Sequence, residues 1–371
     1  MSMTRQLLYA GLTGVICLLS LLMGSGIGQA YHLSEIAMYG VIALFLLLPF
    51  GRTIGGGLVP RREFFLMLAM ALVFVLWPAT RGNKLHGLEY AWLLLFPYVI
   101  GQLKLSEKDV RTIGLTCGAF GFVVVAARLG FGIFGGWNEN EIAMAGFFGC
   151  AVFMVAPWDT WGMKIFQKVM LVVMTLMVLA LDSRSCVIGM LILTAFGFGL
   201  LKRTPFTKKV WLRRIALLAP LLVALVTVLF QNSDLFDQLN NWSMTYFDKP
   251  VFNGRNNIWE HGFILLSEKP LLGEGWIYSG YWHNCALTVL AAFGILGYTL
   301  WILYFEFIMK DAAKFKEDAC LICAIPAILT IMFQQSFELG LVSATGKMLP
   351  YLIMGIMLGR MRYLRDKKSN S

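Results

Sequence analysis

The chain has 371 residues, of which 58% are hydrophobic and only 14% are charged. With glycine counted instead of tyrosine, the apolar fraction is about 65%, whereas soluble domains have roughly 45–50% apolar and 25% charged residues. No water-soluble fold can bury that much apolar surface, so the composition excludes a soluble enzyme, a disordered scaffold and a disulfide-stapled secreted module. Four histidines and seven scattered cysteines do not suggest a metal cluster, and we expect no metal and no cofactor. The sequence predicts an all-α integral membrane protein.

Apolar runs of about 17–25 residues can cross a bilayer as helices. Some runs in this chain are shorter than that, so tilt or flanking residues must complete them. The sequence predicts about twelve transmembrane helices. In chain order they are Leu7–Met23, Leu33–Phe50, Phe64–Trp77, Leu88–Gly101, Ile113–Ala127, Ile142–Ala156, Ile165–Leu181, Cys186–Leu201, Ile215–Phe230, Cys285–Met309, Ala319–Gln334 and Met348–Gly359.

The basic residues indicate how these spans are oriented. If the N-terminus is inside and each run crosses once, 23 of the 31 lysines and arginines lie on the inner side and 8 on the outer side. Cytoplasmic loops carry such a positive excess, so we predict a multi-pass protein with both termini cytoplasmic. The net charge of +10 then reflects topology and attraction to membrane lipids, and we expect no nucleic-acid partner.

The spans divide the chain into three parts. Residues 1–230 form a nine-span bundle, 231–284 an extracytoplasmic loop between spans nine and ten, and 285–371 a three-span bundle with a basic cytoplasmic tail. Within the loop, Arg255–Ser267 has apolar residues at helical spacing, which predicts an amphipathic helix. This helix would lie along the membrane interface, cap the bundle, or do both.

Charged residues at membrane depth are costly and are often functional. Arg184 lies in a short outer turn between two spans, in the run Leu181-Asp182-Ser183-Arg184-Ser185-Cys186. Either it has a functional role, or it pairs with Asp182 and reaches towards the interface.

Two residues of the outer loop are further candidates. Arg255 begins the amphipathic helix, where a guanidinium beside free backbone N–H groups can receive a phosphate; the alternative is an ordinary exposed arginine. His283 stands where the loop returns to the bilayer, and an imidazole can accept a proton from a hydroxyl near neutral pH. The alternative for His283 is a polar interfacial residue bonded to a lipid headgroup or to the backbone.

Four short motifs occur in order around this loop. They are Gly254-Arg255-Asn256-Asn257-Ile258-Trp259, Lys269-Pro270-Leu271-Leu272-Gly273-Glu274-Gly275, His283-Asn284 and Phe293-Gly294-Ile295-Leu296-Gly297. Together with the Ser183-Arg184-Ser185 turn, their order resembles the bacterial O-antigen ligase/polymerase family. Its members show an arginine, a tryptophan a few residues on, a Pro-Leu-x-Gly-x-Gly turn, and a His-Asn pair heading the next span. The strongest match covers about 45 residues, from Gly254 to Gly297.

The resemblance implies a metal-independent, inverting glycosyltransferase of cell-surface polysaccharide biosynthesis in the bacterial cytoplasmic (inner) membrane. The donor would be a glycan on undecaprenyl diphosphate, and the acceptor a second lipid-linked glycan for a polymerase or lipid A-core of lipopolysaccharide for a ligase. Polysaccharide-assembly proteins would be its partners. The resemblance assigns Arg184 and Arg255 to the donor diphosphate and His283 to the acceptor hydroxyl, with Trp259 and Asn284 as further substrate contacts.

The length of the loop favours polymerase slightly over ligase. Only seven residues separate Gly275 from His283, which is compact for the ligase branch. A transporter or flippase of the same lipid-linked glycan is the alternative, and it would carry charges deep within several helices. The main interior candidates here are Glu89 and Glu306, and both lie near the ends of spans. A metal-dependent transferase would need clustered outer carboxylates, whereas Asp234, Asp237 and Asp248 are dispersed.

The charge partition predicts which loops are accessible from outside the cell. A cysteine introduced at Asp237 should react with a membrane-impermeant thiol reagent in intact cells, whereas one introduced in the 202–214 loop should react only after the membrane is opened. Protection of the Asp237 site together with labelling of the 202–214 site would reverse the predicted topology.

Overall fold

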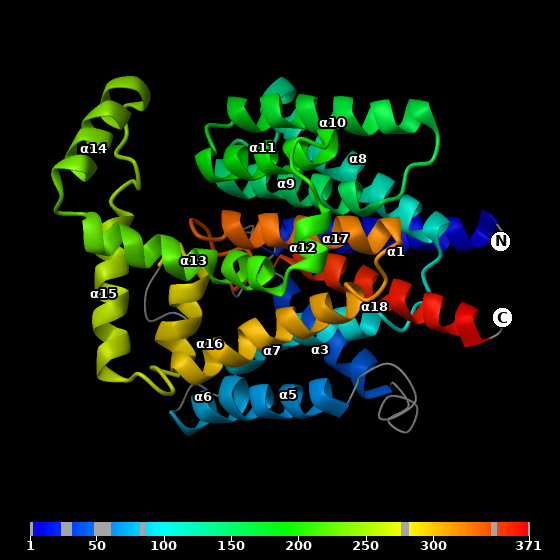
Figure 1. The fold of residues 1–371 in the computed structure, drawn as a ribbon, viewed down its shortest axis with the longest axis horizontal. Coiled ribbons are helices and arrows are strands. Elements are labelled where there is room, and N and C mark those ends of the chain that lie inside the picture. The colour runs from blue at the N-terminus through cyan, green and yellow to red at the C-terminus, as the bar shows by residue number, and fades with distance from the viewer. Residues whose placement is uncertain are drawn as a thin grey trace.

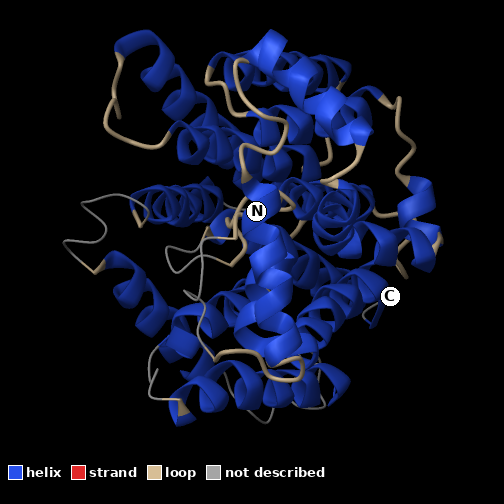
Figure 2. Ribbon diagram, turned by 90° about the vertical axis from the view of Figure 1, so that its left-hand side faces the viewer, coloured by secondary structure: helices blue, strands red, loops and turns tan. Residues whose placement is uncertain are grey.

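The computed structural model describes residues 3–23, 32–47, 61–81, 86–275, 282–342 and 347–369, and throughout these residues the regular elements are helices joined by turns and loops (Figure 2). The prediction of an all-α fold is confirmed for this part of the chain. The helices are α1 (Met3–Leu22), α3 (Leu33–Leu47), α5 (Arg61–Ala71), the π-helical segment η1 (Leu72–Leu76), α6 (Trp77–Thr80), α7 (His86–Ile100), α8 (Glu107–Phe131), α9 (Glu139–Val155), α10 (Trp161–Ala180), α11 (Arg184–Phe198), α12 (Thr204–Lys208), α13 (Val210–Phe230), α14 (Asp234–Phe247), α15 (Arg255–Glu268), α16 (Cys285–Ala312), α17 (Ala319–Gln334) and α18 (Met348–Ser369).

The helices follow the apolar runs of the sequence. Each predicted span coincides with a helix, except that the third is divided into α5, η1 and α6 and that residues 48–50 of the second lie outside the described residues. By length and composition α1, α8, α10, α13 and α16 can each cross a membrane, and several shorter helices are equally apolar. The structure is therefore that of a membrane-embedded protein.

Both chain ends lie at one end of the molecule. Figure 1 shows the N- and C-termini together, whereas α14 and α15 lie at the opposite end. A cytoplasmic location of both termini and an outer location of the 231–284 segment stay predictions that are compatible with this arrangement.

The core is built around α9, which is buried at every residue from Ile142 to Val155. It packs against α8, α17 and α18, and α18 also packs against α7 near the start of the chain. Helices of 285–371 thus lie among those of 1–230. Such all-round burial agrees with the apolar residues on every face of α9, since a water-facing side would have left a polar stripe in the sequence.

The segment between α13 and α16 contains one helix that the sequence predicted and one that it did not. Helix α15 lies where the amphipathic pattern predicted it, and it packs on α13 and α16 with Trp259 buried. Helix α14 begins where the Ser233 hydroxyl accepts a hydrogen bond from the Phe236 N–H at 3.3 Å. Residues 276–281 of the predicted outer loop lie outside the described residues.

Helix α16 is interrupted at Gly294, which has φ 63° and ψ −169°. The turn that follows α15 packs against this interruption through backbone hydrogen bonds. The N–H groups of Glu274 and Gly275 donate to the carbonyls of Ala291 and Ala292 at 2.8 and 2.7 Å, and the Ile295 N–H donates to the Pro270 carbonyl at 2.8 Å. Broken helices are tolerated within membrane proteins when other groups satisfy the freed backbone in this way.

Two glycines make this contact possible. A Cβ on Gly273 would lie 2.5 Å from the Ala291 carbonyl oxygen, and one on Gly294 would lie 2.3 Å from the Leu271 carbonyl carbon. Gly273 also has φ +62°, which favours glycine. The Lys269–Gly275 motif and the Phe293–Gly297 motif therefore form the two sides of one backbone contact.

Replacing Gly273 with Ala should lower the free energy of unfolding by about 1–3 kcal/mol, because both the left-handed backbone and the close approach disfavour a Cβ. Gly130→Ala is the matched control, since a Cβ there meets open space. Unfolding in mixed detergent micelles measures both variants. Equal stability of the two would contradict the described contact.

Candidate functional site

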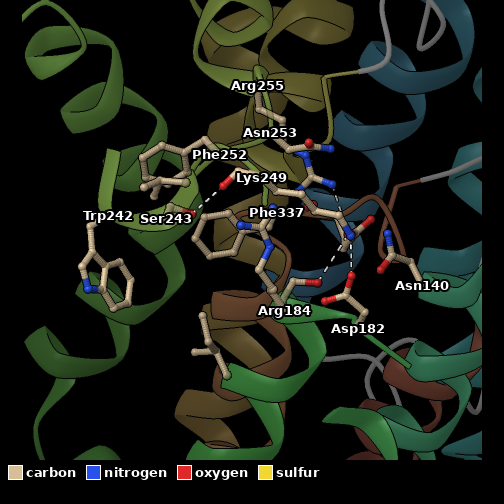
Figure 3. A pocket seen from close by; sticks show the side chains of 14 residues that line it. Asn140, Asp182, Arg184, Trp242, Ser243, Lys249, Phe252, Asn253, Arg255 and Phe337 are labelled. Carbon is tan, nitrogen blue, oxygen red and sulfur yellow. Dashed lines mark hydrogen bonds and ion pairs between the residues drawn. The ribbon is translucent and has the colours of Figure 1, made fainter. Parts of the chain in front are cut away.

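A cavity of about 390 Å³ lies at the end of the molecule that carries α14 and α15. Its lining comes from the starts of α9, α11 and α15, from α14 and its connection to α15, and from the loop after α17. Figure 3 shows the lining residues. They are Asn140, Asp182, Arg184, Ser185, Ile188, Trp242, Ser243, Lys249, Val251, Phe252, Asn253, Arg255, Phe337 and Glu338.

The cavity brings together the two arginines that the sequence singled out. Arg184 is the first residue of α11 and Arg255 the first residue of α15. Gly254 precedes Arg255 with φ 76°, so the chain reverses direction immediately before the guanidinium-bearing residue. A helix start carries a partial positive charge, which adds to that of each guanidinium.

Arg184 is not paired with Asp182. Its Nη1 donates to the Pro250 carbonyl oxygen at 3.1 Å, while Asp182 forms an ion pair with Lys249. The pairing with Asp182 that the sequence allowed is therefore absent, since each residue has another partner. Lys249 is an additional cation of the cavity, and the Ser243 hydroxyl donates to its backbone carbonyl at 2.7 Å.

Arg255 is held against the loop that follows α17. Its Nη1 donates to the Phe337 carbonyl, and its Nη2 lies 3.4 Å from Glu338 Oε1. The same carboxylate oxygen accepts a hydrogen bond from the Ser185 hydroxyl at 3.3 Å. Glu338 is 6% exposed, so Ser185 of α11 and Arg255 of α15 both contact a buried carboxylate.

His283 lies beside this carboxylate on its other side. Its Nδ1 is 4.0 Å from Glu338 Oε2, and within the described residues Nδ1 has no hydrogen-bond partner. The side chain is 40% exposed as a whole, but Nδ1 is buried, and His283 is not among the residues that line the cavity. His283 has φ 46°, a backbone conformation that is uncommon outside glycine and that often marks functional positions.

Trp259 and Asn284 are buried next to His283 and do not line the cavity. The Trp259 Nε1–H donates to the Trp282 carbonyl at 2.7 Å. The Asn284 side chain donates to the Pro220 and Ser336 carbonyls at 2.8 and 3.0 Å and accepts from the Leu287 N–H at 3.1 Å. The polar groups of Trp259 and Asn284 are therefore hydrogen-bonded to other parts of the protein. These bonds fix the chain at Trp282 and at Asn284, the residues before and after His283.

Two residues of the site were missed in the sequence. Lys249 is one of the few basic residues on the predicted outer side, which is the signal that could have identified it. Glu338 follows Gln334-Gln335-Ser336-Phe337, a polar run directly after an apolar span. Polar groups at the end of a membrane span need partners within the protein, and this requirement is the signal that could have identified the Glu338 carboxylate.

The charges of the cavity suit a multivalent anion. Arg184, Lys249 and Arg255 contribute three positive charges, and Asp182 and Glu338 contribute two negative ones. A phosphate group could replace Asp182 as the partner of Lys249 and accept from those N–H groups of Arg184 and Arg255 that are not donated to Pro250, Phe337 and Glu338. Among the described residues, no group of three or more His, Cys, Asp and Glu side chains is placed to bind a metal ion.

Comparison with known proteins gives no family to which the site can be assigned, because no protein-family model and no curated protein matches the chain.

The hydrogen bonds of Asn284 predict a strong effect of a small change. Asn284→Asp keeps the helix cap but places a carboxylate against two carbonyl oxygens in a fully buried position. We expect it to cost at least ~2 kcal/mol of unfolding free energy. Asn241→Asp, on the exposed surface of α14, is the control and should be neutral. Thermal unfolding of the purified variants measures the difference, and a stable Asn284→Asp variant would contradict the buried network.

Proposed function

We propose that the protein is a membrane glycosyltransferase of the O-antigen ligase/polymerase type. It transfers or polymerises undecaprenyl-diphosphate-linked oligosaccharide at the outer face of the bacterial cytoplasmic membrane. One observation carries the proposal: Arg184 and Arg255, from distant parts of the sequence, line the same cavity, and His283 lies beside the carboxylate that contacts Arg255. The family resemblance of the motifs supports the choice of substrate.

The cations of the cavity supply the chemistry that a lipid diphosphate donor requires. When the bond from the anomeric carbon to the diphosphate breaks, negative charge grows on the leaving oxygen. Guanidiniums that are already held in position stabilise that charge without having to reorganise. Because the diphosphate is already a good leaving group, the reaction needs no nucleotide.

His283 is proposed to take the proton of the acceptor hydroxyl as that oxygen attacks the anomeric carbon, which inverts its configuration. The negative charge of Glu338, whose Oε2 is 4.0 Å from Nδ1, would stabilise the imidazolium that forms. Trp259 and Asn284 would then act by fixing the backbone on either side of His283 and not by touching substrate. A second lipid-linked glycan as acceptor stays slightly favoured over lipid A-core.

The proposal predicts how three substitutions affect glycan transfer. Arg184→Ala and Arg255→Ala should each lose roughly 10- to 150-fold in rate, since one charge-assisted contact to the leaving group is worth about 1.5–3 kcal/mol. Arg→Lys should recover part of that loss, because an ammonium keeps the charge but not the two-pronged geometry. His283→Ala should lose roughly a hundred- to ten-thousand-fold while donor still binds.

The assay uses purified protein, lipid-linked oligosaccharide and EDTA, without nucleotide, and resolves the products on a gel. Arg128→Ala is the control, because Arg128 pairs with Glu139 at 3.1 Å and does not line the cavity. Melting curves confirm that each variant is folded. Full activity in all three site variants would refute the proposed site and favour the transporter alternative, as would an equal loss in Arg128→Ala.

A further inference from the structure

Helix α14 exposes a continuous apolar stripe. Leu235, Leu239, Trp242 and Tyr246 follow one another at intervals of four, three and four residues, so they lie on one face of the helix. Their exposed fractions are 62, 46, 54 and 69%. Single exposed apolar residues are ordinary, whereas a stripe that runs the length of a helix indicates a surface with an apolar partner.

The other sides of α14 differ from this stripe. Phe236 and Ser243 are buried on the side that packs against the protein, and the Phe236 ring stacks on that of Phe252 with 6.0 Å between centroids. Asp237 and Asn241 are exposed on the side turned away from the stripe. The helix therefore has a protein-facing side, an exposed apolar side and an exposed polar side.

The start of α14 is fixed beside the end of α13. Residues 231–233 connect the two helices, and the N–H and the hydroxyl of Ser233 both donate to the Phe230 carbonyl, at 3.0 and 2.7 Å. Helix α13 is long and apolar enough to cross a membrane, and its last turns expose Val226, Leu229 and Phe230. The exposed apolar side chains of α13 thus reach the connection to α14.

The far end of α14 is fixed at the turn between α10 and α11. Lys249, two residues beyond the helix, forms an ion pair with Asp182, and the Pro250 carbonyl accepts from Arg184. Helix α10 is also long and apolar enough to cross a membrane. Helix α14 therefore connects the ends of two such helices, and Figure 1 shows it running across the direction of both α10 and α13. This is the orientation of a helix that lies along a membrane surface.

We infer that α14 is a membrane-surface helix whose apolar stripe inserts among the lipids of the leaflet at this end of the bundle. Leucines suit the upper part of the acyl chains, and tryptophan and tyrosine concentrate where the chains meet the headgroups. A second copy of the chain suits the stripe less well, because stable protein interfaces use roughly 20–30 residues a side. The inference rests on the membrane character of the bundle and does not depend on the glycosyltransferase proposal.

Insertion of the stripe has a consequence for the candidate site. Trp242 belongs to the stripe and also lines the cavity that holds Arg184 and Arg255. The inserted helix therefore holds that cavity at the depth of the lipid headgroups, beside the layer in which lipid phosphates lie.

The test places one nitroxide spin label at a time on the full-length protein in phosphatidylcholine nanodiscs that contain one copy each. The seven native cysteines are buried, so unmodified protein serves as the blank for labelling. Leu239→Cys and Tyr246→Cys carry the label on the stripe, and Asp237→Cys and Asn241→Cys are matched controls on the polar side. Power saturation compares collisions with oxygen, which concentrates in lipid, and with a water-soluble nickel chelate. The oxygen-to-nickel ratio should be at least about fivefold higher at each stripe site than at its control.

The two stripe sites separate a helix that lies along the membrane from one that rises out of it. Tyr246 is in the last turn of α14, far from α13, so a lipid-like ratio there requires the whole helix to lie at the surface. Val226→Cys, on the exposed side of α13, gives the reference for a lipid-facing position, and melting curves show that each labelled protein is folded. Nickel access at either stripe site equal to that of its control would overturn the inference, as would shielding from both reagents, which would show that protein covers the stripe.

Discussion

The carboxylate of Glu338 contacts groups from three distant parts of the chain. Ser185 near the start of α11, Arg255 at the start of α15 and His283 before α16 all lie within 4.0 Å of its oxygens. In a weakly polar environment a buried carboxylate must be compensated by partners of this kind. The same charge holds Arg255 at the cavity and places an acceptor beside the imidazole, so the cavity and the candidate base depend on one residue.

Hydrogen bonds to backbone groups also hold the chain segments around this carboxylate in place. The turn after α15 fills the interruption of α16 at Gly294, and Asn284 ties the start of α16 to Pro220 of α13 and to Ser336. In contrast, Glu306, a candidate for a transport route, is 3% exposed and lies 3.8 and 3.7 Å from Arg213 and Arg214 Nε. The open, anion-accommodating space described above lies instead at the end of the molecule that carries α14 and α15. That location is compatible with the proposed reaction of a lipid-linked donor at the outer face.

Local patterns in the sequence predicted local structure well. The apolar runs became helices and the Arg255–Ser267 pattern became α15, because burial against other helices or lipid requires apolar faces. Helix α14 was missed because its asparagines and aspartates suggested a polar loop, although Leu235, Phe236, Leu239, Trp242 and Tyr246 recur at helical spacing. Lys249 and Glu338 were missed for another reason: their importance comes from partners far away in the sequence. Likewise, the motif spacing drew attention to Trp259 and Asn284 but could not show that their polar groups are used internally.

The most direct test of the central claim is equilibrium binding of a short polyprenyl diphosphate to the purified protein. Isothermal titration with farnesyl diphosphate should show binding that weakens with salt and falls tenfold or more in Arg184→Ala and in Arg255→Ala. Farnesol, which lacks the diphosphate, should bind far more weakly, and the arginine substitutions should leave its affinity unchanged. Farnesyl diphosphate affinity that is the same in wild type and in both arginine variants would contradict a diphosphate-binding cavity.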